Sequence, residues 1–289
     1  NEGKMTEMGL TVLQKPLHFT FMSWNILYKI YEKKLKDSAG AKEKQEQIKA
    51  HLEKVKPDIL FVQESGNDIN GGECGKVLRE CEYINRGGGC SIHFNKSKFE
   101  KETKTFGIAL GYKMNIYTEL RSGNREMLAV RLKHIDRKKY IVFLNIWAPH
   151  HIGRKGDYPK YDDFIKLMQD AIMGAGYELG DRIIISGDFN EFYELNLHPP
   201  FEGKIELNLS GYKVSLLLKQ NKPSCCGSDE DIEVSDRGDL IEPTKLEVKP
   251  GNNARVYDLF FDSDGGKGDL IVDKKCHASD HYPIYGDYL

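Results

Sequence analysis

The sequence predicts a layered α/β protein. Short apolar segments of strand length recur along all 289 residues, whereas only a few long stretches carry apolar residues at helical spacing. Many strands with a few interposed helices argue against both an all-β sandwich and a doubly wound parallel sheet. No internal repeat or linker-like change of composition divides the chain. We therefore expect one domain over residues 1–289.

The first third of the chain predicts two strands around a helix. The segment "LHFTFMSWN" at 17–25 alternates between two faces, and "DILFVQE" at 58–64 is a short apolar run with a polar end. Between them, a charged stretch at 41–57 carries a helical apolar stripe formed by Ile48, Leu52 and Val55. Pro57 should end this helix. The glycine- and cysteine-containing region 66–90 is interpreted as loops with at most one helix.

The middle of the chain predicts a strand-rich block and a second helix. Strands are expected at 105–112, 126–132 and 138–149. The segment 158–173 should be a helix whose apolar face consists of Tyr161, Phe164, Ile165, Met168, Ala171 and Ile172. The glycines Gly174 and Gly176 should end it, and the strand "RIIIS" follows at 182–186.

The last third predicts strands separated by irregular chain. After an irregular segment containing "HPP", strands are expected at 212–218, 254–261, 269–275 and 281–288. The intervening stretch 221–253 is polar and rich in turn residues, which favours a surface loop.

Composition excludes some classes of function. There are 42 basic and 44 acidic residues, a net charge of −2, so a polyanion would have to be held by a local patch or a metal. No apolar run is long enough to span a membrane, and residues 1–14 lack the apolar centre of a signal peptide. The six cysteines show no CxxC spacing, which favours reduced thiols in an intracellular protein, cytoplasmic or nuclear. The alternative is a zinc site built from Cys74, Cys81, Cys90 and His93.

A carboxylate, amide or imidazole side chain stands at or near the end of several apolar segments. These are Asn25 after "FMSW", Glu64 after "LFVQ", Asp188 and Asn190 after "IIISG", Asp258 after "RVY", and Asp280 with His281 in "SDH". A single Asp or Asn just beyond a strand is usually a turn former. Their joint occurrence is more informative, because hard oxygen ligands from separate strand ends are what a Mg²⁺ site requires.

The blocks "SWN", "VQE", "GDFN", "YDLFF" and "SDH", in this order, resemble the signatures of the endonuclease/exonuclease/phosphatase superfamily, nearest to its endonuclease branches. The resemblance runs from Asn25 to His281. It implies a four-layer α/β sandwich of two packed mixed β-sheets flanked by helices. It also implies hydrolysis of a phosphoester by an activated water, with Mg²⁺ as cofactor and Mn²⁺ as a possible substitute.

The resemblance also implies roles for individual residues. Glu64 would be the principal metal ligand, with Asn25 beside it and Asp280 on the metal side. Asp188 would orient or deprotonate the attacking water, and Asn190 would bind a phosphate oxygen. The remaining pair is His281, which would contact the phosphate, and Asp258, which would polarise its imidazole.

One block departs from the family's pattern. In "NIWAPHH", Trp147 stands where a tyrosine or histidine is usual, and an indole cannot exchange a proton. His150 is the candidate for the missing role, with His151 a weaker one, and Asn145 is a further candidate for phosphate contact. Two exposed loop histidines are the alternative interpretation.

The favoured substrate is nucleic acid, cleaved by a protein that acts as a monomer. Basic residues near the predicted strand ends are candidates to follow a nucleic-acid backbone: Lys29, Lys33, Lys34, Lys36, Arg121, Arg125, Arg154 and Lys155. Acidic residues are interleaved with them, so solvated surface charges are the simpler explanation. The alternatives are a phosphatase or phospholipase acting on inositol phosphates or sphingomyelin, and an inactive binding module.

Overall fold

The structure is a computed structural model. It describes residues 17–26, 39–64, 69, 72–85, 89–109, 125–149, 161–190, 203–220, 224, 233–234, 240–241, 257–264, 270–273, 279 and 281–288.

The described strands form two large sheets. The six-stranded sheet has the order β14-β15-β1-β2-β4-β3. Its strands are β14 (Ile271–Val272), β15 (Ile284–Tyr288), β1 (Phe19–Asn25), β2 (Ile59–Gln63), β4 (Cys90–Asn95) and β3 (Cys81–Ile84). The seven-stranded sheet has the order β5-β6-β7-β8-β13-β10-β9. Its strands are β5 (Phe99–Ala109), β6 (Glu126–His134), β7 (Lys139–Trp147), β8 (Arg182–Asp188), β13 (Asp258–Asp262), β10 (Tyr212–Gln220) and β9 (Lys204–Leu209).

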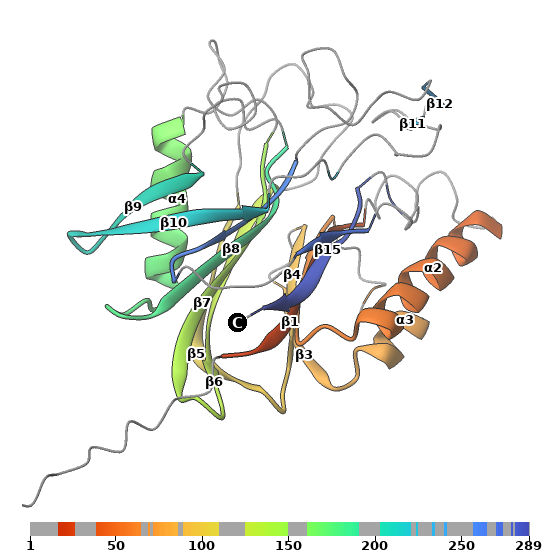
Figure 1. Cartoon of the computed structure of the whole chain (residues 1–289), viewed down its shortest axis with the longest axis horizontal. Coiled ribbons are helices and arrows are strands. Elements are labelled where there is room, and N and C mark those ends of the chain that lie inside the picture. Colours follow the sequence, from red (N-terminus) through yellow and green to blue (C-terminus); the bar gives the residue numbers. More distant parts are fainter. Residues whose placement is uncertain are drawn as a thin grey trace, which may run out of the picture.

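The two sheets pack face to face with helices outside them (Figure 1). Helices α2 (Ala39–Val55) and α3 (Gly72–Val77) cover the six-stranded sheet, and α4 (Tyr161–Gly174) covers the seven-stranded sheet. Each sheet is mixed, because β1 pairs with β2 and β7 pairs with β8 in parallel while the other pairs are antiparallel. The predicted four-layer α/β sandwich is therefore confirmed.

Aromatic side chains fill the space between the sheets. Phe21 of the six-stranded sheet meets Phe260 of the other sheet edge to face, with ring centroids 4.8 Å apart, and lies 5.1 Å from Phe61. All three rings are fully buried. Such contacts add about 0.5–1.5 kcal/mol each beyond the burial of apolar area. They fix the spacing of the two sheets, and with it the spacing of the strand ends.

The first strand is buried on both faces. Phe19 and Phe21 point into the core between the sheets, whereas Met22 and Trp24 pack under α2. The predicted stripe of α2 is confirmed, because Ile48 and Leu52 are 2% and 0% exposed and Val55 packs against the same cluster.

The second predicted helix is also confirmed, as α4. Its buried residues are Phe164, Ile165, Met168, Ala171 and Ile172, and Tyr161 is partly buried against them.

Some elements differ from the prediction. Strands β3, β4 and β9 lie in segments to which no strand was assigned, and β14 is only two residues long. The two-residue strands β11 (Glu233–Val234) and β12 (Leu240–Ile241) pair within the predicted surface loop. Strand β13 begins at Asp258, which was expected within a strand starting at 254. Because β13 is antiparallel to β8, its first residue lies opposite the last residue of β8, Asp188.

A buried ion pair ties β8 to β13 at the end opposite to Asp188. Arg182 donates from Nε to Oδ1 of Asp262 at 3.0 Å and from a terminal nitrogen to Oδ2 at 2.7 Å, and the Tyr288 hydroxyl donates to the same Oδ2. Burial alone would raise the pKa of Asp262, but the hydrogen bond and charge of Arg182 outweigh it and hold that pKa below 3.8.

We expect Asp262→Asn to lower the free energy of unfolding by about 3–5 kcal/mol at neutral pH, because it leaves a buried guanidinium without this carboxylate. A carboxyl whose folded pKa is lowered stabilises the fold above its unfolded pKa and loses that contribution as pH falls through the folded value. The free energies of unfolding of wild type and Asp262→Asn, measured with urea, should therefore become equal as pH falls below 3.8. A difference that does not change with pH would contradict this origin of the effect.

Among the described residues, no helix is both long enough and apolar enough to cross a membrane.

Candidate active site

The side chain of Asn25 connects the two sheets. It ends β1 and is fully buried. Its Nδ2 donates to Oε1 of Glu64 at 3.2 Å and to Oδ2 of Asp188 at 2.8 Å. Glu64 directly follows β2 of the same sheet, whereas Asp188 ends β8 of the other sheet. Three residues from separate parts of the chain thus meet at one rim of the sandwich.

Two of the site residues adopt the left-handed backbone conformation. Glu64 has a φ of 52° and Asn190 a φ of 50°. Asparagine accepts this conformation readily, but for glutamate it is uncommon. Non-glycine residues in this region are held there by their surroundings and occur often at functional sites. In this conformation Glu64 is only 7% exposed and lies beside Asn25.

Asn190 holds the carboxylate of Asp188. Its backbone N donates to Oδ1 of Asp188 at 2.8 Å, and its Nδ2 lies 3.3 Å from Oδ2. The same Nδ2 donates to the carbonyl of Ala148 at 2.6 Å. The carboxamide hydrogens expected to contact a phosphate are therefore directed at Ala148 and Asp188.

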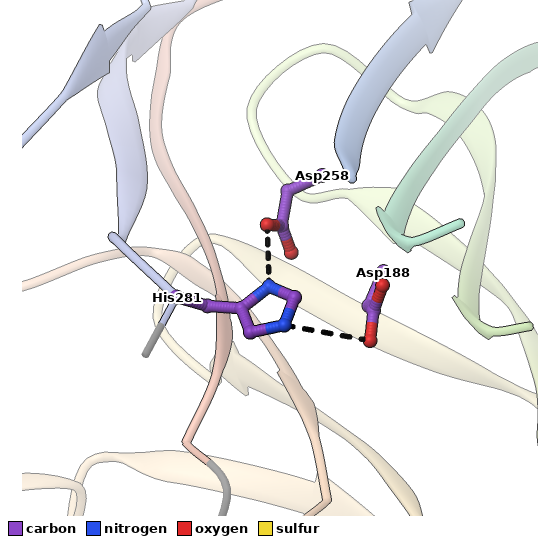
Figure 2. A group of neighbouring side chains, drawn as sticks. All are labelled: Asp188, Asp258 and His281. Carbon is purple, nitrogen blue, oxygen red and sulfur yellow. Dashed lines mark hydrogen bonds and ion pairs between the residues drawn. The ribbon is translucent and has the colours of Figure 1, made fainter. Parts of the chain in front are cut away.

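His281 lies between two carboxylates (Figure 2). Its Nδ1 is 2.7 Å from Oδ2 of Asp258, and its Nε2 is 3.9 Å from Oδ2 of Asp188. A carboxylate only accepts hydrogen bonds, so Nδ1 carries the proton that is donated to Asp258. Nε2 then faces Asp188 across a gap too long for a direct hydrogen bond. This is the geometry of an oriented acid/base histidine.

Burial dominates the protonation of Asp188, which is 1% exposed. Loss of water raises the pKa of this carboxyl to about 7, and the nearby Asp258 acts in the same direction. The positive charges of His281 and Arg125 and the backbone N–H of Asn190 act in the opposite direction. A carboxyl with this pKa can accept a proton near neutral pH.

The donor set fits a divalent cation. Ligand-type atoms of Asp188, Asp258 and His281 lie within 4.8 Å of one another, and Glu64 joins them through Asn25. Oδ1 of Asp258 is buried and has no hydrogen-bond partner within the described ranges. Three buried carboxyl groups at one rim would be costly without a compensating positive charge. Oxygen donors of this kind suit Mg²⁺ or Mn²⁺.

The sequence matches a family model over residues 22–221, and that family is described as the endonuclease/exonuclease/phosphatase family. The chain belongs to this family. It is accordingly a metal-dependent phosphoester hydrolase. A comparison with curated protein sequences gave no match.

Solved structures of the same fold include TDP2 and ANGEL2 proteins. Truncated TDP2 of Caenorhabditis elegans is 18% identical, with a TM-score of 0.56, and the alignment covers 94% of this chain and 97% of that one. ANGEL2, a 2',3'-cyclic phosphatase in complex with adenosine-2',3'-vanadate, is 19% identical, with a TM-score of 0.58 and coverage of 94% and 95%. TDP2 of D. rerio, complexed with a single-strand DNA product, is 13% identical, with a TM-score of 0.56 and coverage of 94% and 99%.

Trp147 stands where the resemblance led us to expect a tyrosine or histidine, and the structure shows what its indole ring contacts. The ring is 4% exposed, with the guanidinium carbon of Arg125 4.1 Å from its centroid. The ring also packs on Gly89, where an added Cβ would collide with ring carbon Cε3. Trp147 is thus a platform that holds Arg125, whose charge acts on Asp188. The sequence placed Arg125 only in a general basic patch, because stacking on Trp147 cannot be inferred from spacing.

Asn145 was a further candidate for phosphate contact, and this is wrong. It is fully buried between the sheets, where its Nδ2 donates to the carbonyls of Val62 and Ser91 at 3.0 and 2.8 Å. Its Oδ1 accepts from Nε2 of Gln63 at 2.6 Å. The side chain of Asn145 therefore joins β7 to β2 and β4. Its contact on β2, Gln63, is the residue directly before Glu64.

The predicted site residues Asn25, Glu64, Asp188, Asn190, Asp258 and His281 are brought together at this rim. His150 and Asp280 lie outside the described residues, as does His151. Of the predicted basic patch, only Arg125 is described.

The alternative zinc site is not assembled. Cys74, Cys81 and Cys90 are not in disulfides, and within the described ranges the one cluster with metal-ligand geometry is the Asp188, Asp258 and His281 group. His93 is buried with its Nε2 3.2 Å from the Ser91 hydroxyl.

Gly187 allows β8 to pass close to β7. It has a φ of 143°, and an added Cβ would lie 2.1 Å from the carbonyl oxygen of Ile146. We expect Gly187→Ala to lower the free energy of unfolding by about 3 kcal/mol or more and to reduce activity, because β8 must move away from β7 next to Asp188.

Gly180 offers a matched control for this prediction. It also has positive φ, 99°, but an added Cβ would meet nothing within 4 Å. Gly180→Ala should cost about 1 kcal/mol through backbone strain alone. Equal thermal unfolding temperatures of the two variants would rule out the collision with Ile146 as the cause.

Proposed function

We propose that this protein is a Mg²⁺-dependent phosphodiesterase that hydrolyses phosphodiester bonds of nucleic acid with an activated water, as a nuclease does. The observation that carries the proposal is the continuous arrangement at the rim. Asn25 joins Glu64 to Asp188, and His281 lies between Asp188 and Asp258. Metal-type donors and an oriented acid/base histidine thus share one site.

Glu64 and Asn25 are the proposed metal-holding residues among those described, with Asp280 as a further candidate from the sequence. The hydrogen bond from Asn25 to Glu64 orients the carboxylate, and the left-handed turn at Glu64 keeps it at the rim. A bound Mg²⁺ would supply positive charge for the non-bridging phosphate oxygens and for the departing oxyanion.

Asp188 is proposed to orient the attacking water and to take its proton. Three hydrogen bonds, from Nδ2 of Asn25 and from the backbone and side chain of Asn190, fix both carboxylate oxygens. A fixed carboxylate with a pKa raised to about 7 combines positioning with basicity. We propose Asn190 chiefly as the residue that orients Asp188, and contact with a phosphate oxygen would require it to release Ala148.

His281 is proposed to contact the phosphate through Nε2. Asp258 fixes the tautomer by accepting the Nδ1 proton, so that Nε2 presents a lone pair or, when protonated, an N–H. Protonated His281 stabilises a phosphoryl oxygen and can give a proton to the leaving oxygen. Arg125, on its Trp147 platform, adds a second positive group that replaces the ionisable side chain missing at Trp147. His150 remains a candidate for the same role.

Nucleic acid is the proposed substrate because of the ligands held by proteins of the same fold. TDP2 of D. rerio was crystallised with a single-strand DNA product and ANGEL2 with an adenosine vanadate. One ligand is DNA and the other is an analogue of a nucleotide, which favours nucleic acid over inositol phosphates or sphingomyelin. A terminal 2',3'-cyclic phosphate is the second candidate substrate, supported by the likeness to ANGEL2.

We further propose that residues 1–289 form one catalytic domain that acts as a monomer. The family model covers residues 22–221, and the similar structures cover 94% of the chain. An intracellular location, cytoplasmic or nuclear, stays a prediction from cysteine usage.

A substrate panel with Mg²⁺ tests the proposal. It contains labelled single-stranded DNA, poly(A) RNA, an abasic duplex, RNA ending in a 2',3'-cyclic phosphate, inositol phosphates and sphingomyelin. We expect oligonucleotide cleavage that is lost with a chelator and in Asp188→Asn. Turnover of inositol phosphates or sphingomyelin alone would replace the nuclease with a phosphatase or phospholipase. No turnover by a folded protein would indicate an inactive binding module.

A further inference from the structure

Ser224 is a buried residue in a stretch that the sequence predicts to be a polar surface loop. The predicted loop covers 221–253, yet Ser224 is 0% exposed. It contacts two segments that are far from it along the chain. One contact is with Asp258, and the other is with Tyr282, the residue after His281.

The first contact is with the backbone of Asp258. The hydroxyl Oγ of Ser224 accepts a hydrogen bond from the Asp258 backbone N at 2.9 Å. Along β13, pairing with β10 extends from Asp262 to Phe260, where it meets Gln220, the last residue of β10. Beyond that point, Ser224 supplies the acceptor that a neighbouring strand would otherwise provide. The hydroxyl therefore fixes the first residue of β13, the one that carries the catalytic carboxylate.

The second contact is with the chain beside His281. The backbone carbonyl of Ser224 accepts from the backbone N of Tyr282 at 2.7 Å. Tyr282 directly follows His281, so one residue holds the main chain at both partners of the 2.7 Å bond between Asp258 and His281. The opposite side of His281 is held by the six-stranded sheet, since Nε1 of Trp24 donates to the His281 carbonyl at 3.0 Å.

We propose that Ser224 is a positioning residue, a clasp that sets the distance and direction between the Asp258 carboxylate and the His281 imidazole. This inference rests on the proposed function, because it assumes that the Asp258–His281 pair acts in hydrolysis. The two partners come from different sheets: Asp258 begins β13, and His281 precedes β15. Without the clasp, their separation depends on the packing of one sheet on the other.

Catalysis is sensitive to such displacements, because a shift of about 1 Å at a reacting group can cost about 100-fold in rate. Ser224→Ala removes the hydroxyl and leaves the carbonyl bond to Tyr282 in place. We expect it to lower kcat about tenfold, with KM within about twofold of wild type, because one of the two clasp contacts remains.

Ser263 provides the matched control. Its hydroxyl accepts from the backbone N of Ile183 at 2.8 Å, so it makes the same kind of bond between β13 and a neighbouring segment. It follows the other end of β13, away from Asp258. Ser263→Ala should lose comparable stability and leave kcat unchanged. A similar fall of kcat in Ser263→Ala would overturn the clasp.

A double-variant comparison separates positioning from general loosening. If Ser224 acts through Asp258, Ser224→Ala should lower kcat by less than about twofold in an Asp258→Asn background. A tenfold loss in both backgrounds would show that Ser224 acts elsewhere, and no loss in either would also overturn the proposal. If Ser224→Ala does not fold, Ser224→Cys replaces it in the same comparison of kcat. Cysteine nearly keeps the volume of serine but offers only a weak hydrogen-bond acceptor.

Proton NMR tests the clasp without any substrate. The Nδ1 proton donated to Asp258 should give a downfield resonance that is absent in Asp258→Asn. It should broaden or move upfield in Ser224→Ala and stay unchanged in Ser263→Ala. An unchanged resonance in Ser224→Ala would overturn the clasp whatever the activity. A shifted resonance in a protein that cleaves no phosphoester would keep the clasp while the proposed function fails.

Discussion

Asp188→Asn should lower kcat for oligonucleotide cleavage by about 10³-fold or more, the largest loss expected from a single substitution in this protein. The amide has nearly the same shape as the carboxylate, but it cannot take a proton from water. Donors of Asn25 and Asn190 now bind both carboxylate oxygens of Asp188. An asparagine side chain has only one oxygen, so some of these donors would face its NH₂ group instead. The attacking water would lose its base and its fixed position together.

The same substitution should leave the fold almost as stable as wild type. Burial raises the pKa of Asp188, and a carboxyl whose folded pKa exceeds its unfolded value costs stability as pH rises from 3.8 towards 7. Asparagine removes that cost at neutral pH and loses part of the hydrogen bonding. These effects oppose each other, so the unfolding temperature should change by only a few degrees.

Asp262→Asn is the natural counterpart, because it removes a carboxylate from the opposite end of the same strand pair. It should lose stability and keep kcat, whereas Asp188→Asn should lose kcat and keep stability. Single-turnover cleavage and thermal unfolding, measured on both variants, give the two quantities. An Asp188→Asn protein that is folded and retains a tenth of wild-type kcat would contradict the assigned role.

His281→Ala should lower kcat by about 10³-fold, because the phosphate loses its charged contact and the leaving oxygen its proton donor. The imidazole is 5% exposed, so its removal leaves a cavity beside Asp258. Free imidazole added to this variant should restore part of the activity. KM should change little, since the interaction is strongest in the transition state.

His134→Ala is a matched control for this second prediction. His134 is also a buried histidine, 4% exposed, but it ends β6 and packs on Phe99. Its removal should lower the unfolding temperature and leave kcat unchanged. If the two variants have the same kcat, or if His281→Ala stays within tenfold of wild type, His281 does not carry the assigned chemistry.

The sequence predicted which residues gather at the rim of the sandwich better than it predicted the strands around them. Asn25, Glu64 and Asp188 stand just where apolar runs stop, and it was their joint occurrence, not the position of any one of them, that indicated a shared site. What the sequence did not show is that Asn25 donates to both carboxylates at once. That contact depends on the spacing of two sheets, which is set by their core.

The missed strands β9 and β4 both carry a strand pattern in the sequence. In β9, Ile205, Leu207 and Leu209 are buried and alternate with exposed residues, a pattern that was interpreted as irregular chain. In β4, the polar residues Ser91 and His93 alternate with apolar residues, although all of them are buried. Alternation of apolar and polar residues indicates a strand, so both strands could have been predicted.

Two contacts could not be found from local sequence. Arg125 stacks on Trp147, and Ser224 bonds to the backbone of segments far along the chain. Both depend on long-range packing. The composition of 221–253 even favoured the opposite interpretation for Ser224, because most of its neighbours in sequence are polar turn residues.

The Mg²⁺ concentration that gives half-maximal cleavage of single-stranded DNA tests the central claim most directly, when it is compared between wild type and Glu64→Gln. Glu82→Gln, which removes an exposed carboxylate on β3, serves as the control. The arrangement predicts an increase of at least about tenfold for Glu64→Gln and no change for Glu82→Gln. Equal half-maximal concentrations in all three proteins, or cleavage that persists in a chelator, would contradict a metal-dependent site built on Glu64.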